Sequence, residues 1–386
     1  GNWTGTRLYR IRHDPDGLNR TIVSERLKSV ELGLTDVGDE EELNLGSGAT
    51  LAAFLDVAES RYRADHTALV IWGHGGGYRS AEQTHPADEK PYGPSVAGVG
   101  GIEPAHRPGT ASAATLETKA LSFDASSGGD ALLTPELGDA VAGRGLSVIG
   151  LDLCYGAMIE IAYEVRKDAD YLIASQGVVG TDGWEYDRLL SSFVAGAVEA
   201  GGLSPEGFLE AAVDQFADAY QTVQRATISA VELSRVDAIY RTLNDFASSA
   251  ADAVRNEATR TDLRALLFHE VTGFYETPGD LAVDLRSLAA RGAARLPHAA
   301  EQAAALSEAV ELAVSRKHPD DDAAVSGLSV HLVPVDESGF PVRHDPSYIR
   351  GSNVGTPLKF VEGSTWAPDI ENEDGLLYRL WYEVFE

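Results

Sequence analysis

The sequence predicts an α/β protein with a mainly parallel central sheet, and three short apolar runs carry that prediction. The runs cover residues 68–72, 146–153 and 171–175. A segment with helical spacing of apolar residues lies between the second run and the third. Short, almost continuous apolar runs that alternate with helical segments are typical of parallel strands buried on both faces.

The N-terminal part is expected to contain a strand over residues 6–12 and then a helix. Apolar side chains recur at helical spacing from Leu51 to Tyr62, and Ser47 belongs to a residue type that caps helices. From 78 to 130 the sequence is rich in Gly, Pro, Ser, Ala and Thr, with few large apolar residues. A stretch of this length without regular structure is usually functional or disordered, so an insertion or activation loop is predicted there.

The later elements follow from helix-start signals and apolar periodicity. Thr134 is expected to cap a helix that has Pro135 at its first position. Further helices are expected over 156–167, 204–220, 236–254, 297–316 and 375–385, and further strands over 227–233 and 327–335. Residues 1–386 are expected to form a single domain, in which 234–386 is a mostly helical extension packed on the sheet.

Charge and cysteine content restrict the classes of function. Sixty acidic and 31 basic residues give a formal net charge of −29, which opposes binding to nucleic acid or to an anionic membrane. No segment approaches the roughly 20 uninterrupted apolar residues that span a bilayer. The chain has one cysteine, so an intrachain disulfide is impossible.

That cysteine, Cys154, follows the second apolar run, and His74 follows the first. The carboxyl ends of parallel strands line one crevice, so a thiol and an imidazole are predicted to meet there. A thiol with a pKa near ~8.5 needs a nearby base to attack as a thiolate, and His74 is the candidate. The backbone N–H groups of Gly75 and Cys154 are the expected oxyanion donors. The alternative for Cys154 is an inert core residue.

Two acidic residues are expected near the thiol. Asp152 precedes Cys154 by two positions and therefore shares its face of the strand, and Asp182 follows the third run. Two carboxylates beside a thiol indicate recognition of Arg or Lys, and a bidentate contact favours Arg. Both residues also have a structural alternative: Asp152 as a hydrogen-bond partner of a nearby loop, and Asp182 beside Gly183 as part of a turn.

Four blocks of the sequence resemble the clostripain family of cysteine peptidases, which belongs to the caspase-like group. These blocks are IWGHGGG at 71–77, LDLCYG at 151–156, ADYLIASQ at 169–176 and DGWEY at 182–186, with a weaker likeness at 326–330, 358–360 and 365–366. The resemblance implies a caspase-like α/β/α sandwich with additional C-terminal helices and strands. It also implies a cysteine endopeptidase that cleaves protein or peptide substrates after Arg or Lys.

The resemblance assigns a role to each candidate residue. It implies that Cys154 is the nucleophile, that His74 is the general acid and base, and that Asp152 and Asp182 form the primary specificity pocket. Such enzymes tend to cut themselves between the His and Cys blocks, and the candidate sites there are Arg79, Lys90, Arg107 and Lys119. The resemblance favours secretion and allows calcium dependence, because some relatives use calcium.

The chain departs from the family pattern in two ways. Family members often have Ala before the cysteine and Met two residues after it, whereas this chain has Leu153 and Gly156. These changes are expected to alter the shape of the pocket and to leave the chemistry in place. The family usually opens with a further strand before the one matched by 6–12, so a truncated or processed N-terminus is predicted.

Two other functions stay open from the sequence. The HGGG sequence at 74–77 also matches an oxyanion motif of α/β-hydrolase esterases, in which His318, His331 or His344 would be the base. The turn that carries the nucleophile in such esterases needs Gly two residues before the nucleophile, and in this chain Asp152 occupies that position. The other alternative is a catalytically silent caspase-like binding protein.

The sequence requires no cofactor. Oxygen ligands gather at His13, Asp14 and Asp16, at Asp36 and Asp39, and at Asp320, Asp321 and Asp322. None of these groups has the spacing of a calcium loop, and the histidines follow no zinc pattern. No metal site is therefore assigned.

Overall fold

The computed structural model of the chain describes most of its residues. They are 5–15, 22–34, 42–77, 121–124, 126–180, 182–223, 225–254, 261–263, 273, 281–332, 348, 358–369, 371–372 and 374–382.

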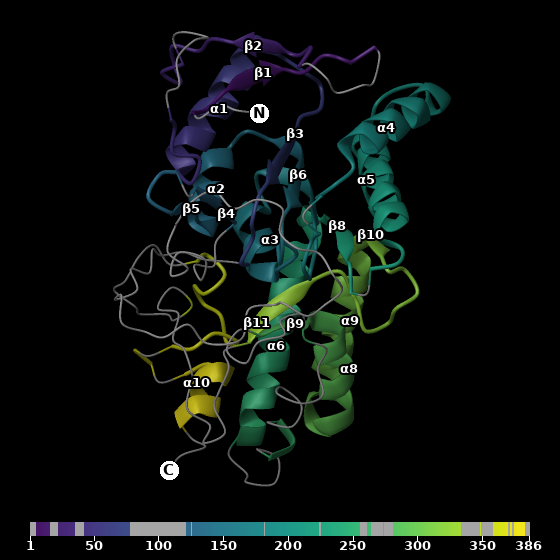
Figure 1. Cartoon of the computed structure of the whole chain (residues 1–386). Helices are drawn as coiled ribbons and strands as arrows, with labels where there is room; N and C mark the ends of the chain where they lie inside the picture. Colours follow the sequence, from purple (N-terminus) through teal and green to yellow (C-terminus); the bar gives the residue numbers. More distant parts are fainter. Residues whose placement is uncertain are drawn as a thin grey trace.

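The central sheet has the strand order β10-β8-β7-β6-β3 among the described residues (Figure 1). Its strands are β3 (Ala68–Trp72), β6 (Leu146–Asp152), β7 (Ala169–Ala174), β8 (Ile228–Glu232) and β10 (Val314–His318). β6 pairs in parallel with both β3 and β7, while β8 is antiparallel to β7 and to β10. The predicted strand, helix, strand order is therefore confirmed, and the sheet is mixed because β8 runs against its neighbours.

The strands form because their side chains alternate between two cores. All seven residues of β6 are buried. Ile149 and Leu151 belong to one hydrophobic core, whereas Val148 and Ile173 belong to the core on the opposite face. A strand buried on both faces needs a nearly continuous apolar sequence, as this run has.

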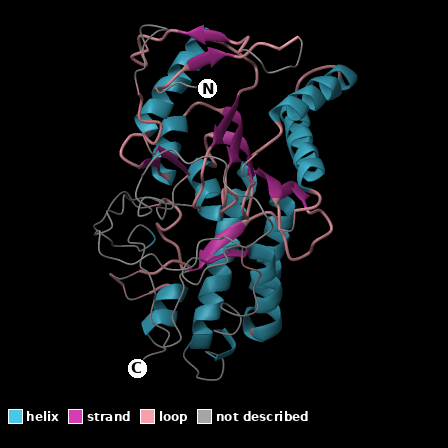
Figure 2. Ribbon diagram, in the orientation of Figure 1, coloured by secondary structure: helices cyan, strands magenta, loops and turns pink. Residues whose placement is uncertain are grey.

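Helices cover both faces of the sheet, which gives three layers (Figure 2). One face carries α4 (Tyr186–Ala200) and α5 (Pro205–Tyr220). The other core includes residues of α1 (Gly48–Arg61), α2 (Thr134–Val141), α3 (Ile159–Val165), α6 (Val236–Val254), α8 (Leu285–Arg295), α9 (Ala300–Ala313) and α10 (Leu376–Tyr382). The predicted α/β/α sandwich is confirmed.

Among the described residues, three two-stranded antiparallel sheets lie outside the central sheet. They pair β1 (Leu8–Arg10) with β2 (Glu25–Leu27), β4 (Ser122–Asp124) with β5 (Asp130–Leu132), and β9 (Leu281–Asp284) with β11 (Ser329–Leu332). Short 3-10 helices occupy Leu233–Arg235 and Pro297–Ala299. The expected insertion over 78–130 thus contains β4 and the first residue of β5 at its end.

The structure corrects two predicted element boundaries. Thr134 is the first residue of α2 and not its cap: Leu133 holds the N-cap position, and its N–H donates to Glu136 at 2.9 Å. The helix expected over 297–316 ends at Ala313, because Val314–His318 pairs with β8 as an edge strand. Ser47 does hold the N-cap position of α1, although its side chain makes no capping bond.

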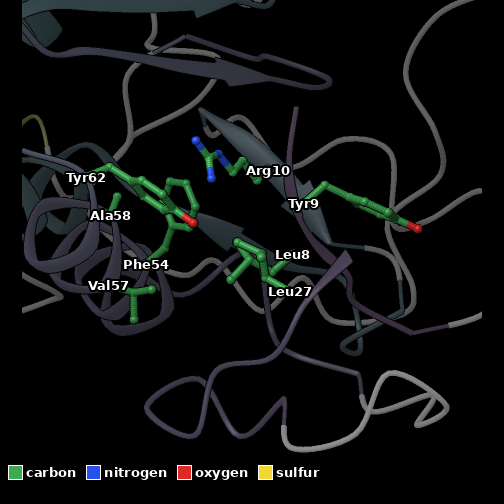
Figure 3. A pocket seen from close by; sticks show the side chains of 8 residues that line it. All are labelled: Leu8, Tyr9, Arg10, Leu27, Phe54, Val57, Ala58 and Tyr62. Carbon is green, nitrogen blue, oxygen red and sulfur yellow. The ribbon is translucent and has the colours of Figure 1, made fainter. Parts of the chain in front are cut away.

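An apolar pocket of about 170 Å³ lies between the β1–β2 hairpin and α1 (Figure 3). It is lined by Leu8, Tyr9, Arg10, Leu27, Phe54, Val57, Ala58 and Tyr62. None of these residues belongs to the predicted site. In the described part of the chain, no helix is both long and apolar enough to cross a bilayer.

Candidate active site

The ends of β3 and β6 bring the His74 segment against the Cys154 segment. Trp72 pairs with Asp152 in the sheet register, and the N–H of Gly73 donates to the carbonyl of Asp152 at 3.3 Å. Beyond the strands the two backbones stay close, since a Cβ on Gly75 would lie 2.3 Å from the carbonyl oxygen of Cys154. Residues 73–75 therefore lie beside 152–154, and the His74 side chain is exposed.

The thiol of Cys154 is half-buried and receives backbone donors. The N–H of Val179 lies 3.4 Å from Sγ, and the N–H groups of Gly75 and of Cys154 also interact with the sulfur. Burial raises the pKa of the thiol, the three N–H groups oppose that rise, and the carboxylate of Asp152 adds to it. A thiol whose pKa is raised in this way depends on a base to react near neutral pH.

The turn after the nucleophile has an unusual backbone. Tyr155 adopts a φ of 59°, in the left-handed region that residues with a Cβ rarely occupy. Its N–H donates to the carbonyl of Gly177 at 3.0 Å, which ties this turn to the chain that follows β7. Backbone strain of this kind persists where the surrounding structure fixes it, and it clusters at functional sites.

Asp152 is 1% exposed, and its two oxygens have different environments. Oδ2 accepts hydrogen bonds from the Trp184 N–H at 2.9 Å and from the Tyr186 hydroxyl at 2.7 Å. Oδ1 is buried and has no hydrogen-bond partner in the described structure. Burial raises the pKa of this carboxyl, and the two donors oppose that rise. The structural alternative for Asp152, a hydrogen-bond partner of a nearby loop, is thus confirmed, because Asp152 accepts hydrogen bonds from Trp184 and Tyr186.

Asp182 lies on the surface of that loop. Its side chain is exposed, and the turn predicted here is present, with the Gly183 N–H donating to Gly180 at 2.9 Å. Burial raises the pKa of the nearby Tyr220 to about 12, and the charges of Asp152 and Asp182 contribute to that rise. The two acids therefore share one neighbourhood, which Tyr220 joins by donating to the Gly183 carbonyl at 2.8 Å.

Position 183 requires glycine for two reasons, its backbone conformation and the close approach of neighbouring side chains. Its φ is 63°, and a Cβ there would lie 2.6 Å from Oδ2 of Asp152 and 2.8 Å from Nε1 of Trp72. A side chain at this position would displace the carboxylate or the indole. The loop can therefore pass over Asp152 only with glycine at 183.

Four residues that contact the site were missed from the sequence: Val179, Trp184, Tyr186 and Tyr220. Trp184 and Tyr186 do belong to the 182–186 block that resembles the family, so a signal was present. The spacing of residues in the sequence, however, does not predict that the start of α4 contacts the end of β6.

Several of the other sequence-predicted candidates fall outside the described residues: Arg79, Lys90, Arg107, Lys119, Asp16, Asp36, Asp39 and His344. His318 is on β10, which β8 and β7 separate from β6, and His331 packs against Tyr348 with ring centroids 4.8 Å apart. In the described part of the chain, no group of three His, Cys, Asp or Glu side chains is placed to hold a metal ion.

Comparison with known proteins identifies the family. The sequence profile of the Clostripain family matches residues 22–89 and 106–310, which is more than half of the chain. Clostripain from Hathewaya histolytica is 26% identical over 205 residues, a match that covers 50% of this chain and 32% of that protein. This chain therefore spans about a third of the length of that relative.

Two solved structures share the fold. The inactive zymogen of a C11 protease from Parabacteroides distasonis matches with a TM-score of 0.53 and 20% identity, over 85% of this chain and 78% of that one. A secreted C11 cysteine protease from Bacteroides thetaiotaomicron, in complex with an irreversible peptide inhibitor, matches with a TM-score of 0.54 and 16% identity, over 85% and 79%. Taken with the family profile, these matches show that the chain belongs to the clostripain family of C11 cysteine peptidases.

Proposed function

We propose that this chain is a cysteine endopeptidase that cleaves peptide bonds after Arg or Lys. The observation that carries the proposal is the contact of Gly75 with Cys154 at the ends of β3 and β6, beside the buried carboxylate of Asp152. A nucleophile, a candidate base and an anionic group thus occupy one edge of the sheet.

In the proposed reaction, Sγ of Cys154 attacks the carbonyl carbon of the substrate while His74 takes the thiol proton. An S–C bond forms, and the carbonyl oxygen becomes an oxyanion. The N–H groups of Gly75 and Cys154 suit this oxyanion because both already point toward the sulfur. His74 then protonates the amine as the C–N bond breaks, and water hydrolyses the acyl-enzyme.

Asp152 and Asp182 are the proposed acids of the primary specificity pocket. Oδ1 of Asp152 lacks a donor, and a guanidinium or ammonium group would supply one. Asp182 is exposed on the loop that contacts Asp152, where it adds negative charge near the entrance of the proposed pocket. Asp182→Ala is expected to weaken cleavage after Arg and to leave alkylation of the thiol unchanged. An unchanged preference for Arg would refute this role.

Self-cleavage between His74 and Cys154 is part of the proposal, with Arg79, Lys90, Arg107 and Lys119 as candidate sites. An enzyme selective for basic residues can cut such a segment in its own chain. Denaturing gels of wild type beside Cys154→Ala test this step. Identical intact bands from both proteins would exclude self-processing.

The proposed activity is tested with fluorogenic arginyl and lysyl peptides, short-chain esters and an arginyl chloromethyl ketone. Wild type should cleave the peptides and be labelled at Cys154, and Cys154→Ala should do neither. Ester turnover that survives in Cys154→Ala without peptide cleavage would favour an esterase. Absence of both labelling and turnover would favour a silent binding protein. Dialysis against a chelator, followed by calcium addition, tests whether the activity depends on calcium, which the family resemblance allows.

A further inference from the structure

The carboxylate of Asp152 has one satisfied oxygen and one free oxygen. Both donors that the structure gives it, the Trp184 N–H and the Tyr186 hydroxyl, bind Oδ2. Oδ1 is buried without a partner in the described structure. A buried carboxylate oxygen that lacks a donor is costly, so this arrangement suits a site that a ligand completes.

Tyr186 is well placed to keep that asymmetry. It is the first residue of α4, and its ring lies beside Trp184 with centroids 6.3 Å apart. Trp184 is 4% exposed and belongs to the core between α5 and the sheet, so one side of Tyr186 has a rigid support. Burial and the bond to Asp152 raise the pKa of Tyr186 well above its ordinary value. Its hydroxyl therefore remains a donor at any pH at which the enzyme is assayed.

We infer that Tyr186 is a positioning residue for substrate specificity: its hydroxyl, with the Trp184 N–H, holds Oδ2 of Asp152 so that Oδ1 accepts the cationic group of a basic substrate side chain. This inference rests on the proposed peptidase function and adds a residue to its specificity pocket. Two fixed donors stop the carboxylate from rotating, so the free oxygen keeps one direction.

The exposed side chains at this edge fit such a pocket. Oδ1 has almost no accessible surface in the free protein, so a substrate must displace the atoms that cover it. Trp72, the sheet partner of Asp152, is 64% exposed, whereas Tyr186 is 37% exposed. If Tyr186 holds the carboxylate, its hydroxyl bond stays in place during binding. If Tyr186 were instead a plug, its removal would improve cleavage.

The test compares two peptides that differ only at the residue before the cleaved bond, one with arginine and one with citrulline. Citrulline is nearly isosteric with arginine and carries no charge, so the ratio of kcat/KM between the peptides reports the interaction with the Asp152 carboxylate. Tyr186→Phe keeps the ring that packs on Trp184 and removes only the hydroxyl. The ratio is expected to fall about tenfold, through KM and not through kcat.

Two further variants complete the design. Tyr171→Phe is the control, because Tyr171 lies on β7 and its hydroxyl does not contact Asp152. Its hydroxyl donates instead to the carboxylate of Glu206 at 3.2 Å, so this variant also removes a bond from a tyrosine to a carboxylate. It should leave the ratio unchanged. Asp152→Asn should abolish the preference for arginine, and adding Tyr186→Phe to it should change the ratio no further, because the two residues act through one carboxylate.

The outcomes separate this inference from the proposed function. A wild type that prefers arginine, together with an unchanged or increased ratio in Tyr186→Phe, would overturn the role of Tyr186 alone. An additive effect of Tyr186→Phe in the Asp152→Asn background would also overturn it. A wild type that cleaves neither peptide and does not react with the chloromethyl ketone would overturn the peptidase proposal, and this inference with it.

Discussion

Lys359 satisfies both oxygens of Glu164, a carboxylate on α3 whose side chain is 2% exposed. Its Nζ lies 2.8 Å from Oε1, and its backbone N–H donates to Oε2 at 3.2 Å. α3 follows the Cys154 turn directly, so this pair ties the segment 358–369 to the helix behind the proposed nucleophile.

Lys359→Met should therefore destabilise the protein, because it leaves the buried carboxylate with a single donor. We expect the free energy of unfolding to fall by about 2 kcal/mol, less than for a fully buried pair since the lysine is half-exposed. Denaturant unfolding measures the change. Arg316→Met is the control, because its pairs with Glu210 and Asp214 are exposed, and it should cost at most about 1 kcal/mol. Equal losses in the two variants would contradict this account.

Glu160 should make stability depend on pH. Its carboxyl is buried between α3 and β11, where Oε1 accepts from the His331 N–H and the Tyr348 hydroxyl, both at 2.8 Å. Burial raises the pKa of Glu160 from 4.5 to about 7. The folded state therefore keeps this proton when the unfolded state has lost it. The contribution to stability is complete below pH 4.5 and is lost as pH rises through about 7, a change of about 3 kcal/mol.

Glu160→Gln, which cannot ionise, should flatten that dependence. Unfolding free energies at pH 5 and pH 8 should differ less in the variant than in wild type, whatever the variant's absolute stability. An unchanged difference would show that Glu160 does not titrate in this range.

Gly75→Ala should abolish activity. The added Cβ would lie 2.3 Å from the carbonyl oxygen and 2.9 Å from the nitrogen of Cys154, so one of the two backbones must move. Both proposed oxyanion donors belong to these residues, and we expect kcat to fall by roughly 100-fold or more. Gly196→Ala on α4 is the matched control: its Cβ meets nothing within 4 Å, and it should raise stability by up to about 1 kcal/mol without affecting turnover. Full activity in Gly75→Ala would contradict the proposed contact.

His74→Ala should separate thiol reactivity from turnover. Burial raises the pKa of Cys154, so the thiolate population grows only as pH rises beyond the ordinary thiol range. Alkylation by iodoacetamide at such alkaline pH should survive in His74→Ala, because hydroxide replaces the base. Peptide cleavage at neutral pH should be lost, because the leaving amine still needs a proton. Parallel loss of both at every pH would mean that His74 is needed for the fold.

The sequence predicts the elements whose burial matches their periodicity. The apolar runs at 146–153 and 171–175 became β6 and β7, and the helix expected over 236–254 has those bounds. α4 was not predicted. Its apolar residues divide between a packed side, with Leu189 and Phe193, and an exposed side, with Leu190, Val194 and Val198. The helix expected over 297–316 extends past Ala313, where α9 ends. The start of the following strand, β10, is decided by its pairing with β8, which is far away in the sequence.

One general rule about parallel sheets predicts part of the site from the sequence. The carboxyl ends of neighbouring parallel strands must lie together, which places Gly75 beside Cys154 without further knowledge. The bond from Tyr186 to Asp152 depends instead on how the loop after β7 crosses the end of β6. That path is set by the positive φ of Gly183 and by packing of Trp184 in the core. Neither follows from residue spacing.

The pairing of β3 with β6 determines what a cut between them would do. Ala68–Trp72 is hydrogen-bonded to Val148–Asp152, and Leu69 and Leu151 share one hydrophobic core. A chain cleaved anywhere from 78 to 120 would remain a single particle in gel filtration and in native mass spectrometry. Only denaturant would release the two polypeptides, and each would expose the edge of a sheet that the other had covered. Neither fragment alone would retain the site, so the cleaved protein would be an obligate pair of chains.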